Sequence, residues 1–219
     1  MRKDPEFFKY SGHYMMVGPQ GSGKTIAAIE LTRRIQQEYP KCKVASNCCY
    51  MLRDYDITHW KDLIDIKNSH FGLIAQMDEL QSWFSSTAAK NFPEEMVGII
   101  CQQRKNRRLM ISTSQSFSRV AKTIRLQVDY VCECKTFFGC LTIVRMRKPE
   151  MDCDGNVLKM RTLKTYFFVQ DDELRDLYDT YHVIDTLSEV GFVDKAVQVN
   201  NTSNTVINID AKNKKLFSK

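Results

Sequence analysis

The chain has 219 residues, of which 43% are hydrophobic and 26% are charged, and its formal net charge at pH 7 is +6. This length and composition suit one globular domain with a full core and exclude wholesale disorder. No stretch approaches the ~18 consecutive apolar residues of a membrane helix, and no apolar leader follows Met1, so we expect a cytoplasmic protein without membrane insertion. The mild positive charge fits a polyanionic partner and an ordinary soluble protein about equally well.

The eight cysteines require a chemical assignment. Disulfide frameworks are typical of small secreted chains, whereas this chain is long enough for a good core and has no secretion signal. We therefore expect reduced, mostly buried thiols. A zinc site built from Cys132, Cys134, Cys140 and Cys153 is the alternative, because the first two share a strand face, although the ligand spacing of common zinc modules is absent.

The first ten residues are polar and aromatic and predict an arm. An apolar run from His13 to Val17 predicts a buried strand. Apolar residues at helical spacing predict a helix from about Lys24 to Glu38, which Pro40 ends. A glycine-rich loop at residues 18–23 joins the strand to the helix.

This loop carries the strongest motif of the chain. Gly-Pro-Gln-Gly-Ser-Gly-Lys-Thr at residues 18–25 matches G-x-x-x-x-G-K-[ST] in full and lies between a strand and a helix, as a phosphate-binding loop requires. Its backbone N–H groups would surround phosphate oxygens, Lys24 would reach the β- and γ-phosphates, and the Thr25 hydroxyl would bind Mg²⁺. The residues expected to bind ATP are Gly18, Pro19, Gln20, Gly21, Ser22, Gly23, Lys24 and Thr25.

The next two predicted strands run from Cys42 to Ser46 and from Phe71 to Met77, with a short helix around Trp60 to Ile66 between them. Asp78 and Glu79 follow the second of these strands. Asp78 can hold Mg²⁺, indirectly through water, and Glu79 can polarise a water for in-line attack on the γ-phosphate. The carboxylate pair therefore favours hydrolysis of a nucleotide over transfer to a small acceptor.

A predicted helix from Pro93 to about Asn106 ends in a basic run at residues 103–108. These cations either complement the C-terminal end of the helix, or supply a guanidinium that reaches the γ-phosphate of a neighbouring subunit. Arg104 is the first candidate for the second role, with Arg107 and Arg125 in reserve.

A fourth predicted strand, Leu109 to Thr113, leads into Ser-Gln. If this strand lies between the two phosphate-binding strands, Gln115 would sit beside the γ-phosphate as a sensor; a polar loop without a role is the alternative. A short helix around Phe117 to Arg125 and a fifth strand from Val128 to Cys134 are predicted next.

The pattern changes beyond residue 134. Apolar runs at 137–146 and 163–169 flank Asp-Cys-Asp-Gly-Asn at 152–156, whose Asp-Gly pair predicts a hairpin turn. Residues 171–182 have a helical pattern, and the terminal residues are rich in Asn, Thr and Lys. The sequence therefore predicts an α/β chain with an N-terminal arm (1–10), a phosphate-loop domain (11–185, with a β-hairpin extension at 137–169) and a polar, basic tail (186–219).

These motifs together resemble a known family. Met-Asp-Glu-Leu-Gln-Ser-Trp-Phe (77–84), Gln-Gln-Arg-Lys-Asn-Arg-Arg (102–108), Ser-Thr-Ser-Gln (112–115) and Lys-Thr-Ile-Arg (122–125) follow the phosphate loop in this order. The set is similar to that of the zonula-occludens-toxin-like ATPases of phages. These belong to the HerA–FtsK type of ring-forming DNA-translocating and viral genome-packaging ATPases. The match covers roughly residues 10 to 185.

The resemblance implies a P-loop NTPase of the additional-strand (ASCE, RecA-like) type with a mostly parallel sheet. It also implies a pentameric or hexameric ring in which ATP hydrolysis drives double-stranded DNA through the pore. The family roles fall on the residues already named, with Gln115 sensing phosphate and Arg104 acting in trans. Ser46 or Asn47 would hold Glu79 inactive until DNA binds.

A soluble packaging motor fits the chain better than filamentous-phage assembly proteins do, because we expect no membrane helix. We accordingly expect a subunit in the host cytoplasm that docks on a viral procapsid portal and packages the genome without cutting it. Pore-loop cations would contact DNA phosphates without sequence preference. The candidates are Arg53, Lys61 and Lys90, each of which also fits an ordinary surface charge, and the lysines of the tail are a further candidate.

Three alternatives stay open at this point. The first is a phage assembly or DNA-transfer ATPase of the same family. The second is a P-loop kinase, against which the pairing of Glu79 with Asp78 argues. The third is a scaffold protein that binds nucleotide without hydrolysing it.

Overall fold

A computed structural model describes residues 7–48, 50–59, 61–84, 98, 105–152 and 156–178. These residues all belong to one compact unit, which ends at Asp179. The expected tail (186–219) lies outside the described residues, as does the expected helix from Pro93 to Asn106 apart from Gly98, Lys105 and Asn106. None of the helices in the described ranges is long and apolar enough to span a membrane.

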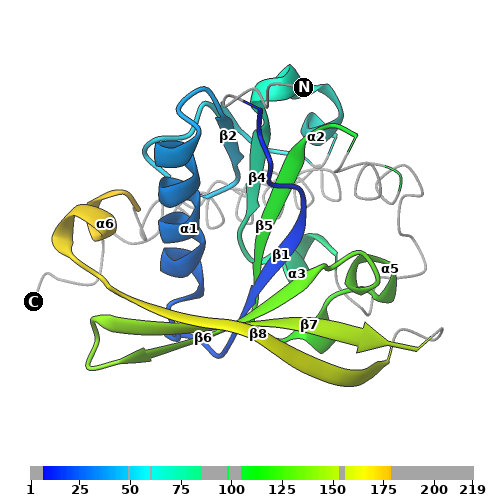
Figure 1. The fold of residues 1–219 in the computed structure, drawn as a ribbon, viewed down its shortest axis with the longest axis vertical. Helices are drawn as coiled ribbons and strands as arrows, with labels where there is room; N and C mark the ends of the chain where they lie inside the picture. Colours follow the sequence, from blue (N-terminus) through cyan, green and yellow to red (C-terminus); the bar gives the residue numbers. More distant parts are fainter. Residues whose placement is uncertain are drawn as a thin grey trace, which may run out of the picture. The chain divides into compact units, whose positions relative to one another are not determined.

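An eight-stranded sheet in the order β3-β2-β4-β5-β1-β6-β7-β8 forms the centre of this unit (Figure 1). The strands from β3 to β6 are parallel, and β7 and β8 continue the sheet as antiparallel strands. The strands are β1 (Gly12–Val17), β2 (Lys43–Ser46), β3 (Tyr55–Asp56), β4 (Leu73–Met77), β5 (Arg108–Ser114), β6 (Tyr130–Phe137), β7 (Leu141–Met151) and β8 (Val157–Val169). Because β5 lies between β1 and β4, the predicted additional-strand P-loop fold with its C-terminal hairpin is confirmed.

The helices are short except for α1. They are α1 (Lys24–Glu38), α2 (Asp62–Asp65), α3 (Leu80–Trp83), α5 (Lys122–Arg125) and α6 (Asp172–Asp176), with 3₁₀ turns η1 (Ser69–Phe71) and η3 (Phe117–Arg119). The bounds predicted for α1 are those of the structure. The single helix predicted around Phe117 to Arg125 is wrong, because Val120 and Ala121 have extended ψ angles of 143° and 140° and separate η3 from α5.

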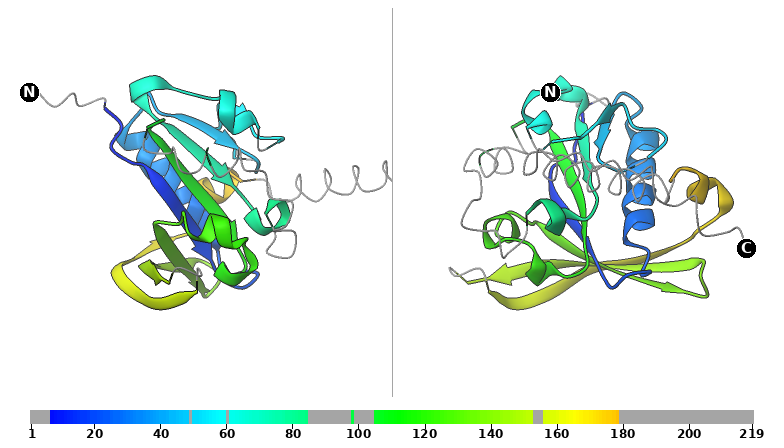
Figure 2. Two further views of the ribbon diagram at one scale, coloured as in Figure 1. Left: turned by 90° about the vertical axis from the view of Figure 1, so that its right-hand side faces the viewer. Right: turned by 180° about the vertical axis from the view of Figure 1, so that it is seen from behind.

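The core lies on both faces of the sheet, around the central strands β4 and β5. Every residue of β4 and β5 is buried, which is expected of parallel strands covered on both faces. One apolar cluster joins α1 to one face of the sheet through residues such as Ile29 and Ile111, and the other lies on the opposite face around Met77 and Ile124. Figures 1 and 2 show α1 on one face and α3 and α5 on the other.

The packing also includes residues expected to form the arm. Phe8 is buried, and its N–H donates to the carbonyl of His70 over 3.1 Å. Its ring packs on Gly72, where a Cβ atom would lie 2.1 Å from the ring. Phe8 also forms an edge-to-face aromatic pair with Tyr39. The N-terminal segment is therefore anchored to the start of β4.

The boundary between the fifth strand and the hairpin differs from the prediction. The fifth strand was predicted to end at Cys134 and the hairpin extension to begin at residue 137, but β6 extends to Phe137 and a tight turn follows, in which Phe138 and Gly139 have φ angles of 53° and 70°. Strands β6, β7 and β8 therefore form one antiparallel meander. It crosses the end of the parallel strands (Figure 1).

Candidate nucleotide site

The phosphate-binding loop connects β1 to α1. Gly23 precedes α1 in the left-handed conformation, with φ 82°, and no side chain caps the helix. A Cβ atom at Gly23 would lie 2.4 Å from Oγ1 of Thr136, so both the backbone and the packing require glycine here. Because no side chain accepts from the first N–H groups of α1, they are available to an anion.

Lys24 is held inside this loop. Its side chain is only 7% exposed, and its Nζ donates to the backbone carbonyl of Pro19 over 3.1 Å. Among the described residues, no carboxylate forms an ion pair with this ammonium, and a phosphate oxygen would provide the counter-charge. The loop therefore suits a polyphosphate.

Asp78, directly after β4, lies against Thr25 at the start of α1. The Thr25 hydroxyl donates to the two carboxylate oxygens of Asp78 over 3.1 and 3.3 Å. A hydroxyl and a carboxylate in contact are hard oxygen ligands of the kind that Mg²⁺ binds through one or two protein groups. The two residues predicted to bind the metal are thus brought together, and they fit Mg²⁺.

Thr113 on β5 connects the two acidic residues. Its hydroxyl donates to Oδ1 of Asp78 over 2.5 Å and accepts from the backbone N–H of Glu79 over 2.9 Å. The sequence motifs predicted a role for Gln115, two residues later, and none for Thr113. The signal was present: Thr113 is a hydroxyl residue at the carboxyl end of a strand between the two phosphate-binding strands.

Asn47, just after β2, fixes the backbone of Asp78 from the other side. Its Oδ1 accepts from the Asp78 N–H over 2.6 Å, and its Nδ2 donates to the Asp78 carbonyl over 3.1 Å. Asp78 is therefore held at its backbone by Asn47 and at its carboxylate by Thr25 and Thr113.

Glu79 has a left-handed backbone, with φ 49° and ψ 50°, which is uncommon outside glycine. Its carboxylate accepts a hydrogen bond from Nε2 of Gln81. Ser46, expected with Asn47 to restrain Glu79, donates to Gln76 over 3.3 Å instead. Among the described residues, Gln81 rather than Ser46 or Asn47 holds the carboxylate of Glu79, because the two earlier side chains are turned to Gln76 and to the Asp78 backbone.

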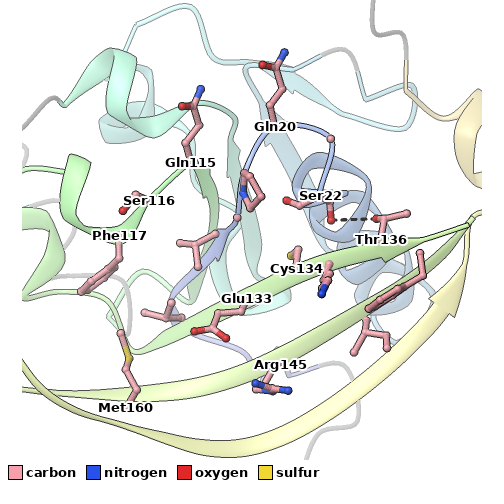
Figure 3. Close-up of a pocket in the computed structure, with 18 residues that line it drawn as sticks. Gln20, Ser22, Gln115, Ser116, Phe117, Glu133, Cys134, Thr136, Arg145 and Met160 are labelled. Atoms are coloured by element: carbon pink, nitrogen blue, oxygen red, sulfur yellow. Dashed lines mark hydrogen bonds between the residues drawn. The ribbon is translucent and has the colours of Figure 1, made fainter. Parts of the chain in front are cut away.

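A row of hydroxyl and amide groups supports the loop from the antiparallel strands. Oγ1 of Thr136 on β6 donates to the Ser22 carbonyl over 3.1 Å (Figure 3). The same atom contacts Oγ1 of Thr142 on β7 at 2.9 Å. Gln170, after β8, donates to Thr142 over 2.7 Å. The meander thereby fixes the position of the loop, a role that the sequence analysis missed.

A cavity of about 830 Å³ adjoins the loop on its β6 side. In Figure 3, Gln20 and Gln115 lie at one rim, and Glu133 and Arg145 lie at the opposite side. Phe117 adds an aromatic wall, so the cavity combines apolar surface with a few polar groups. It is continuous with the phosphate-binding loop and has room for the nucleoside part of a nucleotide.

Gln115 itself is exposed and accepts a hydrogen bond from the guanidinium of Arg119. It lines the cavity, while Thr113 contacts Asp78 and Glu79. The role of Gln115 as a phosphate sensor stays a prediction.

The other predicted side chains are distributed over the fold. Arg104 and Lys90 lie outside the described residues. Arg53 forms an ion pair with Asp56, and Arg107 lies over the ring of Phe7 at 3.4 Å. Lys61, also a DNA-contact candidate, is exposed before α2, and Arg125 ends α5 with its Nε buried.

Four of the five described cysteines are buried, and two of these, Cys132 and Cys134, lie on β6. Burial raises the pKa of the Cys42 and Cys132 thiols to about 12 and raises the pKa of Cys134 as well. These thiols are therefore protonated at neutral pH. The described residues contain no group of three or more metal-binding side chains, and Cys153 of the zinc alternative lies outside the described part.

No protein-family model matches the sequence, and no curated protein matches it. Solved structures do. The N-terminal domain of zonular occludens toxin from Neisseria meningitidis is similar over 77% of this chain and 99% of its own, with a TM-score of 0.56 and 14% identity. The genome packaging NTPase B204 from Sulfolobus turreted icosahedral virus 2 in complex with AMPPCP matches over 62% of this chain and 77% of its own, with a TM-score of 0.45 and 12% identity. The flagellar accessory protein FlaH from Methanocaldococcus jannaschii matches over 72% and 84%, with a TM-score of 0.43 and 9% identity. The first similarity confirms, at the level of the fold, the resemblance found in the motifs.

Proposed function

We propose that this chain is the ATP-hydrolysing subunit of a ring-shaped motor that translocates double-stranded DNA, packaging a phage genome into a preformed capsid. One observation carries the enzymatic part: Thr25, Asp78, Thr113 and Glu79 form a connected network beside the phosphate-binding loop. The motif resemblance at residues 77–84, 102–108 and 122–125 supports the motor.

The chain's own groups account for binding of a triphosphate. The first N–H groups of α1 and the buried Lys24 ammonium would bind the phosphates. Thr25 and Asp78 would hold Mg²⁺, which would neutralise phosphate charge when bound. The cavity beside the loop would take the base and ribose, with Phe117 offering a ring for stacking.

Hydrolysis needs a base and a fixed geometry. The carboxylate of Glu79 would accept a proton from water as the water oxygen bonds to the γ-phosphorus and the bond to the leaving ADP oxygen breaks. The Thr113 hydroxyl holds Glu79 and Asp78 in a fixed relative position, because it accepts from the Glu79 N–H and donates to the Asp78 carboxylate. Gln81, hydrogen-bonded to the Glu79 carboxylate, would release it on activation.

The test is steady-state ATP hydrolysis by the purified chain, with and without long double-stranded DNA, over a salt series. Lys24→Ala should abolish turnover, and Glu79→Gln should bind ATP but lose turnover by a factor of about 10²–10⁴. Lys9→Gln, at an exposed lysine of the N-terminal segment, is the control. Turnover that survives Lys24→Ala would contradict the assignment of the nucleotide site to this loop. Turnover that DNA does not stimulate at any salt concentration would contradict a motor that works on DNA without a portal.

A further inference from the structure

Within the part of the chain that the structure describes, the outer half of the β7–β8 ribbon presents an exposed face. Its register pairs Met146 with Lys164, Lys148 with Arg161, and Glu150 with Lys159, so these six residues share one face. On the inner half of the ribbon the same face is covered, because Val144 and Phe168 are buried in the core that contains α1. Lys148, Glu150, Lys159, Arg161 and Lys164 are all exposed.

A β-bulge gathers the cations on this face. Met146 on β7 pairs with Lys164 on β8, but the next residue, Arg147, pairs with Thr162. Leu163 is therefore skipped in the pairing and is an extra residue on β8. In a regular strand, Lys164 and Arg161 would point to opposite faces, because side chains alternate. The extra residue reverses that alternation and places Arg161 on the face of Lys164.

The result is a like-charge pair in the middle of the ribbon. Lys148 and Arg161 are directly opposite each other, an arrangement that destabilises a sheet. Within the described residues, neither forms an ion pair, and Glu150 opposes Lys159 rather than either of them. Lys164 adds a third positive charge, above the ring of Tyr166 at 6.0 Å. An anionic partner would relieve this repulsion.

We propose that this basic ribbon face (Lys148, Lys159, Arg161 and Lys164) binds the phosphate backbone of double-stranded DNA; the inference deepens the proposed motor function and rests on it. The face is a row of exposed charges on two strands, which suits a linear polyanion more than a small anion. Neighbouring same-face residues on a strand are about 6.8 Å apart, and duplex DNA presents one charge per about 1.7 Å of its axis, so each cation can meet a phosphate. A two-stranded ribbon can also enter the major groove.

The experiment measures binding of the full chain to a fluorescent duplex by anisotropy, from 50 to 300 mM salt. Lys148→Gln/Arg161→Gln is compared with Lys9→Gln/Lys67→Gln, which removes the same two charges from exposed positions near the start of β1 and β4. We expect the ribbon variant to lower the slope of log K against log salt by about two, and to weaken binding at 50 mM salt by on the order of tenfold or more. The control variant should keep the wild-type slope and affinity.

A second variant separates DNA binding from folding. Lys148→Glu places opposite charges at the central pair, so its melting temperature should be equal to or above that of the wild type while its DNA affinity falls. Basal ATP hydrolysis should be unchanged in both ribbon variants.

The outcomes distinguish the inference from the function on which it rests. If the wild type hydrolyses ATP and binds DNA, but the ribbon variants bind DNA as the control does, the basic ribbon face is not the contact and the motor proposal survives. If the wild type hydrolyses ATP yet binds no duplex at 50 mM salt, the inference falls together with the DNA part of the proposal. Binding of the ribbon to phosphatidylserine vesicles without binding to DNA would also overturn it.

Discussion

At the scale of single residues, Thr113 is the side chain on which the geometry of the proposed active site depends. It donates to Asp78 and accepts from the Glu79 N–H, so one hydroxyl fixes a proposed metal ligand and the backbone of a proposed base. In the proposed mechanism, Thr113 acts through these two residues and not on the phosphates themselves. Thr113 is therefore a positioning residue, and its removal should affect turnover more than binding.

We predict that Thr113→Val lowers kcat for ATP by about 10- to 100-fold with little change in the Kd of ATP, because valine fills the volume but lacks the hydroxyl. Thr113→Ser, which keeps the hydroxyl, should restore most of the rate. The kcat is measured by phosphate release and the Kd by titration of a fluorescent nucleotide. Equal losses in both variants would indicate a packing role instead.

Asn47 supports a second residue-scale prediction. Its amide makes two hydrogen bonds to the backbone of Asp78, and Asn47→Ala removes both. The free energy of unfolding should fall by about 1–2 kcal/mol, and the concentration of Mg²⁺ needed for half-maximal hydrolysis should rise. Urea denaturation and a Mg²⁺ titration measure the two effects. Ser46→Ala, whose hydroxyl binds Gln76 and not Asp78, should leave the Mg²⁺ requirement unchanged.

The sequence predicted the residues of this site that belong to a contiguous motif. Lys24 and Thr25 follow from G-x-x-x-x-G-K-[ST], and Asp78 from a carboxylate at the end of an apolar strand. Asn47 and Thr113 lack such a motif, because a polar residue at a strand end is common and only the strand order reveals which ends meet. The topology β2-β4-β5-β1 brings them together.

At the scale of elements, β1 and β5 share a buried polar contact. His13 on β1 is fully buried, and its Nε2 lies 2.6 Å from Oγ of Ser112 on β5. Burial lowers the pKa of His13 to about 3, well below its ordinary value of 6.5. The neutral imidazole therefore belongs to the folded state, and the unfolded chain binds a proton that the folded chain does not.

This difference makes stability depend on pH with a definite sign. Between pH 6.5 and about 3 the unfolded state binds the extra proton, so the free energy of unfolding falls as the pH is lowered, by up to about 1.4 kcal/mol per pH unit from this group. Above pH 6.5 the contribution is constant. We predict that, when both are measured by urea denaturation at pH 7, 5.5 and 4.5, the free energy of unfolding falls more steeply with decreasing pH for the wild type than for His13→Gln. The same pH dependence in both proteins would contradict the conclusion that buried His13 makes stability depend on pH. His70→Gln, at an exposed histidine, serves as the control.

The meander and the phosphate-binding loop form a second pair of coupled elements. Thr136→Val removes the donor to the Ser22 carbonyl and the contact with Thr142. We expect the KM for ATP to rise several-fold, because the loop loses the group that holds it in position, and kcat to change less. Steady-state kinetics measures both. Thr165→Val, at an exposed threonine of β8, should behave as the wild type; a matching rise in KM there would point to a general effect on the meander.

Element boundaries were predictable where a strong local signal existed. Gly23 and Pro40 flank α1, and its predicted bounds match the structure. The β6–β7 turn was missed because its first residue is Phe138, which is 94% exposed and left-handed and gives no turn signal in an apolar run. The bulge at Leu163 was also unpredictable, since it depends on how β8 pairs with β7.

At the scale of the whole molecule, alternation of strands and helices predicted the parallel sheet, and the change of pattern after residue 134 predicted the antiparallel extension. The order of strands came from the resemblance, since periodicity does not specify which strands are neighbours. One consequence of that order concerns assembly. Gln20 and Gln115 at the rim of the site are exposed, and in the proposed ring this is the side on which a neighbouring subunit would lie.

Coupling between neighbouring subunits of the proposed ring can be tested by mixing active and inactive chains. In the proposed ring, each site depends on its neighbour, so a hydrolysis-deficient Glu79→Gln subunit should impair the wild-type subunits beside it. Mixing the two at constant total concentration with MgATP and duplex DNA should lower the rate more steeply than in proportion to the variant fraction. Mixing in active Lys9→Gln subunits should cause no loss. A strictly proportional decline with Glu79→Gln would mean that the sites work independently. Hydrolysis would then need no ring, because a single chain already connects Thr25, Asp78 and Glu79 through Thr113 beside the loop that holds Lys24.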